Sequence, residues 1–477
     1  MKILSLSIAL AALMVLGVAH AQEQYEFERG YPNAETSQRA RDDADFQRAV
    51  TAYRFWYASV SNEGIFNGSR EMGLKDNESA LIAAVGPSAV AFTANSDTPY
   101  GAGVLDVTDG PWVIELPPGP FIGLANDHHQ GWILDMGLPG PDAGKGGKHL
   151  ILPPGYKSKP PAGYYTGASA SYKVLFAIRA LPIKGNTEGA LDALRKVKIY
   201  PLSDPNKRIK LVDASGKTMD STCLRWEDNI QYWEVLHKII DAEPLVPKYF
   251  PMYGLLSALG IEKGKPFHPD ARMKDILERA TKVARDQMLV SAFDSVRPDR
   301  INWPDRKWEW LGLVPGSVQF ETAGGIDLEA RDRWFAQAIV TSPAMFRRTA
   351  GAGSLYWMSA KDSTDAFLDG GKNYKLTLPQ PVPGKLFWSV TFYDTQTRSQ
   401  VQTDQNKAAL RSLFEFKEAP TTSPAELYVG PTAPVGNEKH WIKTTPGRGW
   451  FAYIRIYGPE AAAFDKSWKP GDFEEVK

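Results

Sequence analysis

At 477 residues the chain is too long for one ordinary hydrophobic core, so we expect more than one domain. Lys plus Arg and Asp plus Glu number 55 each, so no global charge favours binding to nucleic acid or to an anionic membrane surface. The 14 Trp, 19 Tyr and 21 Phe predict large half-buried faces, which are common in all-β and α+β proteins.

The N-terminus has the pattern of a signal peptide. Lys2 supplies a positive start, residues 3–18 are almost wholly apolar, and Ala19-His20-Ala21 gives a small-x-small cleavage pattern. The apolar run has the length of a signal peptide rather than of a membrane span. We therefore expect residues 1–21 to be removed near Ala21. The mature chain is then expected to have no transmembrane segment and to be soluble, in the periplasm or secreted.

The first expected domain, residues 22–205, is β-rich with a leading helix. Apolar residues recur at three- and four-residue spacing over 36–61, which predicts a helix. Short alternating runs broken by Pro and Gly follow, and they predict strands. A short helix is expected at Thr187–Val197. The strand candidates are Gly103–Val107, Trp112–Leu116, Phe121–Ala125, His149–Leu152 and Tyr172–Ile178.

A mainly helical linking region is expected at 206–345, and a C-terminal β-sandwich-like domain at 346–477. Helical spacing continues through about 226–300, and Ala330–Thr341 is a further helix candidate. The predicted class is α+β and β-rich, with two β-sandwich or jelly-roll-like domains joined by the helical segment. The C-terminal strand candidates are Tyr374–Leu378, Phe387–Tyr393, Glu426–Val429 and Trp450–Tyr457.

The segment Asn95-Ser-Asp-Thr-Pro-Tyr100 concentrates polar side chains just before a predicted strand. Pro99 pushes Thr98 toward extended geometry, so a turn is expected here. The polar cluster is either a hydrogen-bonded turn or the edge of a site. In the second case Asp97 is a candidate catalytic residue, and Asn95 and Tyr100 are candidate substrate-binding residues.

Asn126-Asp127-His128-His129 is the second polar cluster. Successive strand side chains point to opposite faces, so Asp127 and His129 share a face while His128 and His129 diverge. An Asp–His pair at this spacing can orient a base or ligate a metal. The alternative is a polar strand end with hydrogen-bonded histidines. Asp127 and His129 are retained as candidate catalytic residues, and no metal ligand or cofactor is assigned.

An arginine flanked by tyrosines marks the C-terminal domain. Tyr453, Arg455 and Tyr457 alternate with apolar residues, and Tyr393 ends another predicted strand. Such an arginine suits a clamp for a carboxylate, phosphate or sugar, and it equally suits a structural Arg–Asp pair on an exposed sheet face. Tyr393, Arg455 and Tyr457 are therefore candidate substrate-binding residues.

Other motifs are weak or missing. The glycine-rich segment 142–148 resembles an anion cradle but is better read as a flexible hairpin. GxSxG, HExxH and GxGxxG do not occur. Cys223 is the only cysteine, which excludes an intrachain disulfide, and its surroundings match no catalytic signature.

Several stretches together resemble a bacterial family that pairs two domains of unknown function, twelve-fifty-four (N-terminal) and twelve-fourteen (C-terminal). The resemblance implies a two-domain, β-rich architecture, commonly with a signal peptide, and it implies no reaction. Relatives often carry a different polar pair at His128-His129. The stretches are Asn95–Tyr100, Gly119–Phe121, Gly144–Lys148, Leu152–Tyr156, Gly264–Phe267, Leu368–Tyr374, Phe387–Asp394 and Arg455–Tyr457 with Pro459.

Three hypotheses about function follow. The first is an exported hydrolase of a small organic molecule, in which Asp127 or Asp97 orients a base, His129 moves the proton and Arg455 holds an anionic group. The second is a non-catalytic periplasmic or envelope protein that binds a small-molecule ligand through its aromatic residues. The third is a metal-dependent enzyme that uses Asp127 and His129.

Overall fold

The computed structural model describes residues 25–351, 353–419 and 421–476. The expected signal peptide and its cleavage position lie outside these residues. Contacts divide the chain into two compact units, Met1–Asp45 and Phe46–Lys477. In the described part of the first unit, β1 (Phe27–Glu28) pairs antiparallel with β2 (Tyr31–Pro32). The Tyr25 hydroxyl donates to Asp43 over 2.8 Å.

The predicted leading helix is confirmed and is longer than expected. Helix α1 covers Ala34–Glu71, and the boundary between the two units falls inside it. Beyond residue 46 the helix is buried on several sides, and Trp56, Ser59 and Asn62 are all inaccessible to solvent. Buried polar groups on a helix need partners. Asn62 donates to the carbonyls of residues 127 and 128, so α1 is tied to the end of β7.

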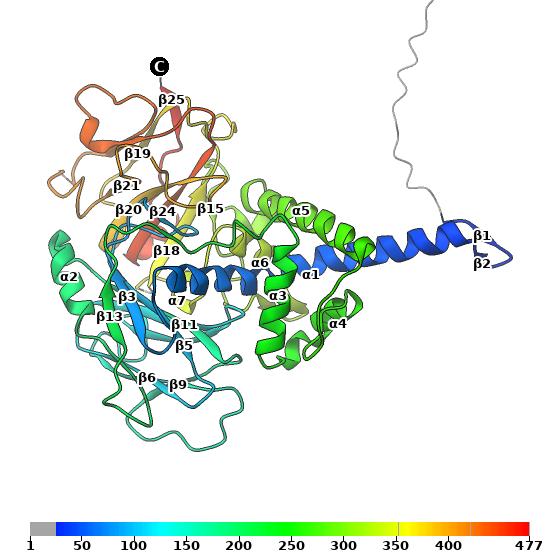
Figure 1. The fold of residues 1–477 in the computed structure, drawn as a ribbon. Coiled ribbons are helices and arrows are strands. Elements are labelled where there is room, and N and C mark those ends of the chain that lie inside the picture. The colour runs from blue at the N-terminus through cyan, green and yellow to red at the C-terminus, as the bar shows by residue number, and fades with distance from the viewer. Residues whose placement is uncertain (1–24, 352, 420, 477) are drawn as a thin grey trace, which may run out of the picture. The chain divides into compact units, whose positions relative to one another are not determined.

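The N-terminal β region contains two mixed sheets, because β10 pairs parallel with β9 and β13 pairs parallel with β3. Short strands β4 (Ala89–Val90) and β14 (Met219–Asp220) also pair. Helix α2, labelled in Figure 1, covers Thr187–Leu194. The six-stranded sheet has the order β13 (Lys210–Asp213), β3 (Ser79–Ala83), β5 (Tyr100–Asp106), β11 (Lys173–Ala180), β7 (Phe121–Asp127), β8 (Trp132–Gly137). The four-stranded sheet has the order β10 (Tyr165–Ala168), β9 (Gly147–Leu152), β6 (Trp112–Leu116), β12 (Lys198–Pro201).

Alternation along β11 gives the six-stranded sheet two different faces. Phe176 and Ile178 belong to the core shared with the four-stranded sheet. Leu175, Ala177 and Arg179 point the other way, because side chains alternate along a strand. A strand with apolar residues on both faces is covered on both faces, so this sheet carries a second packed surface.

The linking region is mainly helical, as expected from the apolar spacing. Helix α5 begins where the Asp270 side chain accepts the Met273 N–H, a standard N-cap. The last predicted helix is shorter than expected, because residues 336–341 leave the helix. The helices are α3 (Gln231–Ala242), α4 (Phe250–Ala258), α5 (Ala271–Phe293), α6 (Leu328–Phe335) and α7 (Pro343–Phe346), with the short strand pair β16 (Glu321–Thr322) and β17 (Gly325–Ile326).

Tertiary hydrogen bonds account for the early end of α6. The Thr341 N–H donates to Asn126 over 3.0 Å, and the Asn126 amide donates back to the Thr341 carbonyl over 2.9 Å. The Val340 N–H donates to Gln130 over 2.6 Å, and Val340 has φ +58°. These bonds replace the helical ones, so the expectation of a helix up to Thr341 is wrong after Phe335.

The C-terminal region also has two sheets, and its four predicted strands are confirmed. The α+β, β-rich, two-domain architecture is confirmed, while the domain boundaries at 205/206 and 345/346 stay predictions. The five-stranded sheet has the order β15 (Glu309–Trp310), β18 (Ser354–Ser359), β24 (Trp450–Pro459), β20 (Gly384–Asp394), β21 (Ala409–Arg411). The four-stranded sheet has the order β23 (Trp441–Lys443), β22 (Ala425–Gly430), β19 (Asn373–Leu378), β25 (Glu474–Val476).

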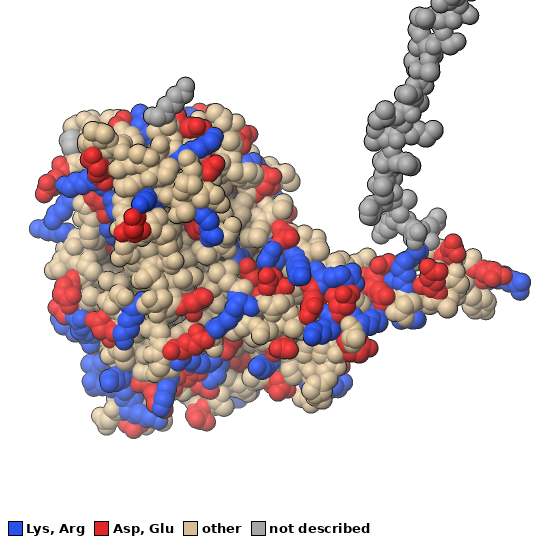
Figure 2. Space-filling model, turned by 45° about the horizontal axis from the view of Figure 1, so that its top comes forward, with Lys and Arg blue, Asp and Glu red and all other residues tan. Residues whose placement is uncertain are grey.

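The described surface carries charged side chains of both signs (Figure 2). Basic and acidic side chains are interspersed on the face shown in Figure 2. Within the described residues, no helix combines the length and the apolar character needed to cross a membrane.

Candidate functional site

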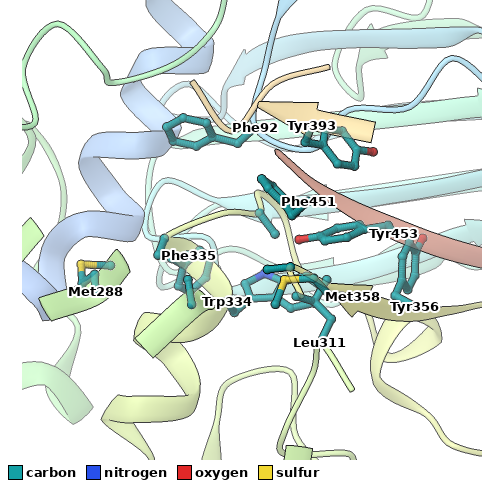
Figure 3. Close-up of a cluster of buried hydrophobic side chains, with 14 of the residues drawn as sticks. Phe92, Met288, Leu311, Trp334, Phe335, Tyr356, Met358, Tyr393, Phe451 and Tyr453 are labelled. Carbon is teal, nitrogen blue, oxygen red and sulfur yellow. The ribbon is translucent and has the colours of Figure 1, made fainter. Parts of the chain in front are cut away.

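A largely apolar cavity lies between the second face of the six-stranded sheet and the five-stranded C-terminal sheet. Its volume is about 160 Å³, close to the engineered apolar cavity of about 150 Å³ that binds benzene. Figure 3 shows part of the hydrophobic cluster around it, including Trp334, Leu311, Tyr356 and Tyr453. We call this space the central cavity. Its wall includes Ala102, Leu124, Leu175, Ala177, Trp334 and Tyr356.

The central cavity has a polar end made by two Arg–Tyr pairs, one from each sheet. Arg179 on β11 lies opposite Tyr100 on β5, and Arg455 on β24 lies opposite Tyr356 on β18. All four residues line the cavity. Arg455 is 2% exposed and donates to Thr391 over 2.9 Å. The polar end therefore combines two guanidinium groups and two phenols next to an apolar space.

The predicted loop 95–100 forms a turn and contributes to this end. The Asn95 side-chain oxygen accepts the Asp97 N–H over 3.0 Å, which fixes the orientation of the amide. The Asn95 amide nitrogen therefore donates to the Tyr100 hydroxyl over 2.7 Å. Burial raises the pKa of Tyr100, so its hydroxyl stays protonated. Asn95, Tyr100 and Arg455, all predicted from the sequence, thus line one cavity.

Asp97 lies behind the cavity wall and ties the loop to the C-terminal sheet. Its carboxylate accepts from Ser389 over 2.7 Å and from the Tyr457 hydroxyl over 3.0 Å. The Tyr457 hydroxyl also accepts from Arg179 over 3.3 Å. Burial raises the pKa of Tyr457 well above its usual range, and the Asp97 charge adds to the rise. A chain of hydrogen bonds therefore joins Arg179, Tyr457 and Asp97.

Tyr393 holds the loop from the other side. It is fully buried, and its hydroxyl donates to the carbonyls of Thr93 and Ala94 over 3.2 and 3.0 Å. Arg455 donates to the same Thr93 carbonyl over 2.8 Å. Tyr393 and Tyr457 do not line the cavity themselves. They support the residues that do.

Asp127 and His129 belong to a different part of the fold, and the expected contact between their side chains is not formed. The Asp127 carboxylate accepts the backbone N–H groups of His129 and Gly131 over 2.9 and 2.7 Å, because the strand ends here in a tight turn. The His129 ring contacts the Ser59 hydroxyl over 2.9 Å. Neither residue lines the central cavity, and no hydrogen bond joins either to Asp97 among the described residues. The catalytic roles assigned to these three residues stay a prediction.

The pKa values of the two buried histidines are shifted in opposite directions. Burial lowers the pKa of His129 to about 3, and the positive charge of His128 adds to this effect. Burial alone would also lower the pKa of His128, but hydrogen bonds to Glu243 and Glu63 raise it to about 9. Burial raises the pKa of Asp127 to about 6, against the opposing effect of the backbone N–H groups that it accepts. His129 is thus held neutral and His128 charged.

His128 is fixed by two carboxylates, one from α1 and one from the residue that follows α3. Its Nδ1 lies 2.9 Å from Glu243 and its Nε2 lies 3.2 Å from Glu63. The ring centroids of His128 and His129 are 6.2 Å apart and nearly parallel, so the two side chains do not diverge as strand alternation predicted. The strand ends at Asp127, and alternation no longer applies beyond it.

Other candidate groups are structural. No cluster of three or more His, Cys, Asp or Glu in the described residues is arranged to hold a metal. Cys223 is fully buried, and burial raises the pKa of its thiol to about 12. Asp142, in the glycine-rich segment, pairs with His149 over 3.1 Å and accepts the Gly137 N–H over 2.7 Å. The expectation of a hairpin is wrong, because the segment connects β8 to β9 and these two strands lie in different sheets.

Sequence reasoning missed Arg179 and Tyr356. The predicted strand 172–178 stopped one residue before Arg179, although Arg179 continues the spacing of Leu175 and Ala177. A single arginine in register with apolar strand positions is a signal that one face of the strand meets a polar end. Tyr356 gave no signal of its own, because its role depends on pairing with Arg455.

Two family models match this chain, one in each of the two β-rich regions. "Protein of unknown function (DUF1254)" matches residues 78–201, and "Protein of unknown function (DUF1214)" matches residues 353–461. The order along the chain is the one expected from the sequence. A search of curated proteins finds no match.

One of the two solved structures described here supports the fold. The chain is similar to the VPA0106 protein from Vibrio parahaemolyticus, with 17% identity, a TM-score of 0.56, and coverage of 91% of this chain and 100% of that one. An uncharacterized protein from Burkholderia cenocepacia aligns with 14% identity and a TM-score of 0.40, over 93% of this chain and 99% of that one. The first similarity shows a shared fold and nothing about activity.

Proposed function

Because this chain matches both DUF1254 and DUF1214, we propose a function that needs both matched regions, namely the binding of a small, largely apolar organic molecule in the central cavity. One observation carries the proposal. Asn95, Tyr100 and Arg179 come from the first matched domain, and Tyr356 and Arg455 come from the second. Apolar cavities with a few convergent polar groups are the usual form of small-molecule sites.

The cavity favours binding over hydrolysis. Among the described residues that line it, the titratable side chains are tyrosines and arginines, with no His, Asp, Glu, Lys or Cys. Hydrolysis at neutral pH usually uses one of those missing groups as base or nucleophile. Asp127 and His129 lie outside the cavity wall. We therefore favour the ligand-binding hypothesis over the hydrolase, and over a metal-dependent enzyme built on these two residues.

We further propose that the protein is exported. The basis is the signal-peptide pattern over residues 1–21, with cleavage near Ala21. The mass of the protein purified from its own cells should correspond to a chain that begins at Gln22. A mass that includes residues 1–21 would contradict export by this route.

Filling the cavity tests the binding proposal. Ala177→Leu adds three carbon atoms to a half-buried position in the cavity wall, so it should weaken binding at least about tenfold while the protein stays folded. Calorimetric titration with toluene, indole and 1-octanol measures this effect. Ala271→Leu, at an exposed position at the start of α5, is the matched control and should bind as the unaltered protein does.

Two outcomes would count against the proposal. Absence of binding by all three probes would show that the cavity does not take small apolar molecules. Undiminished binding by Ala177→Leu would place the bound molecule elsewhere.

A further inference from the structure

The polar end of the central cavity carries positive charge without a direct counter-ion. Within the described residues, no carboxylate oxygen lies within 4 Å of Arg179 or Arg455. Arg179 has one long hydrogen bond, 3.3 Å to the Tyr457 hydroxyl, and its guanidinium lies 5.7 Å from the centre of that ring. A guanidinium offers five N–H donors, so most of the donors of Arg179 are not used by the protein.

The charges around this end do not balance. Arg179 and Arg455 contribute two positive charges, the Asp97 carboxylate acts on Arg455, and no Asp or Glu is among the described residues that line the cavity. The nearby phenols do not compensate, because burial raises the pKa of both Tyr100 and Tyr457 and keeps them neutral. One positive charge is therefore left over at Arg179, which is half-buried and lines the cavity, so a bound carboxylate could take the place of water there.

One of the two tyrosines at this end, Tyr100, has a free donor. Tyr100 accepts the Asn95 amide hydrogen, so its own hydroxyl hydrogen is available to another acceptor. Tyr100 lies opposite Arg179 across the β5–β11 pair. The two side chains thus present donors to the same part of the cavity, next to an apolar space of about 160 Å³.

We infer that the ligand of the central cavity is a small amphipathic carboxylate, with its single negative charge against Arg179 and Tyr100 and its apolar body between the two sheets. One carboxylate neutralises the one excess charge, and its two oxygens match the guanidinium fork. The inference rests on the proposed function and adds the chemical class of the ligand. The size of the cavity suits a benzene ring or a short alkyl chain.

Matched acids and amides test the inference. Octanoate and octanamide differ in charge at nearly constant shape, and so do benzoate and benzamide. Calorimetric titration of the purified protein at pH 7 should give about 10- to 100-fold tighter binding for each acid, since hydrogen bonds to charged groups are the stronger ones. Arg179→Gln should reduce the preference to about twofold or less while changing amide affinity by less than about threefold.

Arg195→Gln is the control of the same residue type. Arg195 is an exposed arginine, paired with Glu188, Asp192 and Asp213, and its loss should leave the acid preference unchanged. Equal affinity for acids and amides in the unaltered protein would overturn the inference and leave the proposed binding function standing. Absence of binding by all four probes would remove both. The comparison of acid with amide needs no variant, so misfolding of Arg179→Gln cannot hide the answer.

Discussion

Raising the pH from 6.5 to 9 should destabilise this protein through one buried histidine. In the folded state, hydrogen bonds that the His128 ring donates to Glu243 and Glu63 overcome the effect of burial and raise the pKa of His128 from 6.5 to about 9. Its contribution to stability is complete below pH 6.5, where both states are protonated. It is lost as the pH rises to 9, because the unfolded chain releases the proton first.

The structure sets the size of this effect. A rise in pKa from 6.5 to about 9 corresponds to a loss of up to about 3 kcal/mol, at about 1.4 kcal/mol per pH unit. The ring is 3% exposed and Glu243 is 2% exposed, so solvent screens the pair little. The side chain of Glu63 is 22% exposed, which places it at the accessible edge of the triad.

Urea unfolding followed by tryptophan fluorescence measures this loss. The free energy of unfolding is extrapolated at pH 6.5, 7.5, 8.5 and 9. His128→Gln removes the titrating group, so its stability should change much less over the same range. His237→Gln replaces a histidine on α3 that bonds the Lys265 carbonyl, and this control should keep the fall. A constant free energy of unfolding in the unaltered protein would refute the charged Glu–His–Glu arrangement, as would an equal fall in His128→Gln.

Three further outcomes follow from buried groups. The Cys223 thiol should not react with a thiol reagent at pH 8 until the protein is unfolded in urea, because burial raises its pKa to about 12. Arg398→Met should cost about 3–5 kcal/mol in urea unfolding, because it removes the guanidinium 2.5 Å from Glu227 and leaves that buried carboxylate with the Tyr57 hydroxyl but without its cation. Gly64→Ala should cost about 1–3 kcal/mol, because its Cβ would lie 2.7 Å from a backbone carbon of the facing loop; Gly254→Ala, with open space, is the control and should differ little from the unaltered protein. Rapid labelling of the native thiol, or losses below about 0.5 kcal/mol in Arg398→Met or Gly64→Ala, would contradict these assignments.

Among the described residues, local pattern predicted nine of the 19 strands in the four larger sheets and missed others, such as β3, β8 and β18. Trp112–Leu116 matches β6, and Tyr374–Leu378 lies within β19, since apolar alternation between Pro and Gly breaks is set by the strand itself. The predicted helix 36–61 ends ten residues before the C-terminal end of α1, in the polar stretch that contains Ser59 and Asn62. In the fold these side chains are buried and bond to the turn after β7, which no local pattern reveals.

The site was partly predictable. Asn95, Tyr100 and Arg455 were found because polar clusters and an Arg between tyrosines stand out in apolar surroundings. Arg179 was missed, because its partners come from strands far away in the chain and a prediction based on neighbours cannot bring them together. Asp127 and His129 met the spacing of an acid–base pair, but the strand ended too early for that spacing to apply.

The central claim is that the cavity between the two matched domains holds a small organic acid, and a crystal grown with 4-bromobenzoate tests it directly. The anomalous signal of bromine locates the apolar end of the probe without assumptions about the protein. We expect one peak within the cavity lined by Ala177 and Trp334, with the carboxylate within hydrogen-bond distance of Arg179 and Tyr100. A bromine peak at any other position, or a cavity that stays free of the probe at saturating concentration, would contradict the claim.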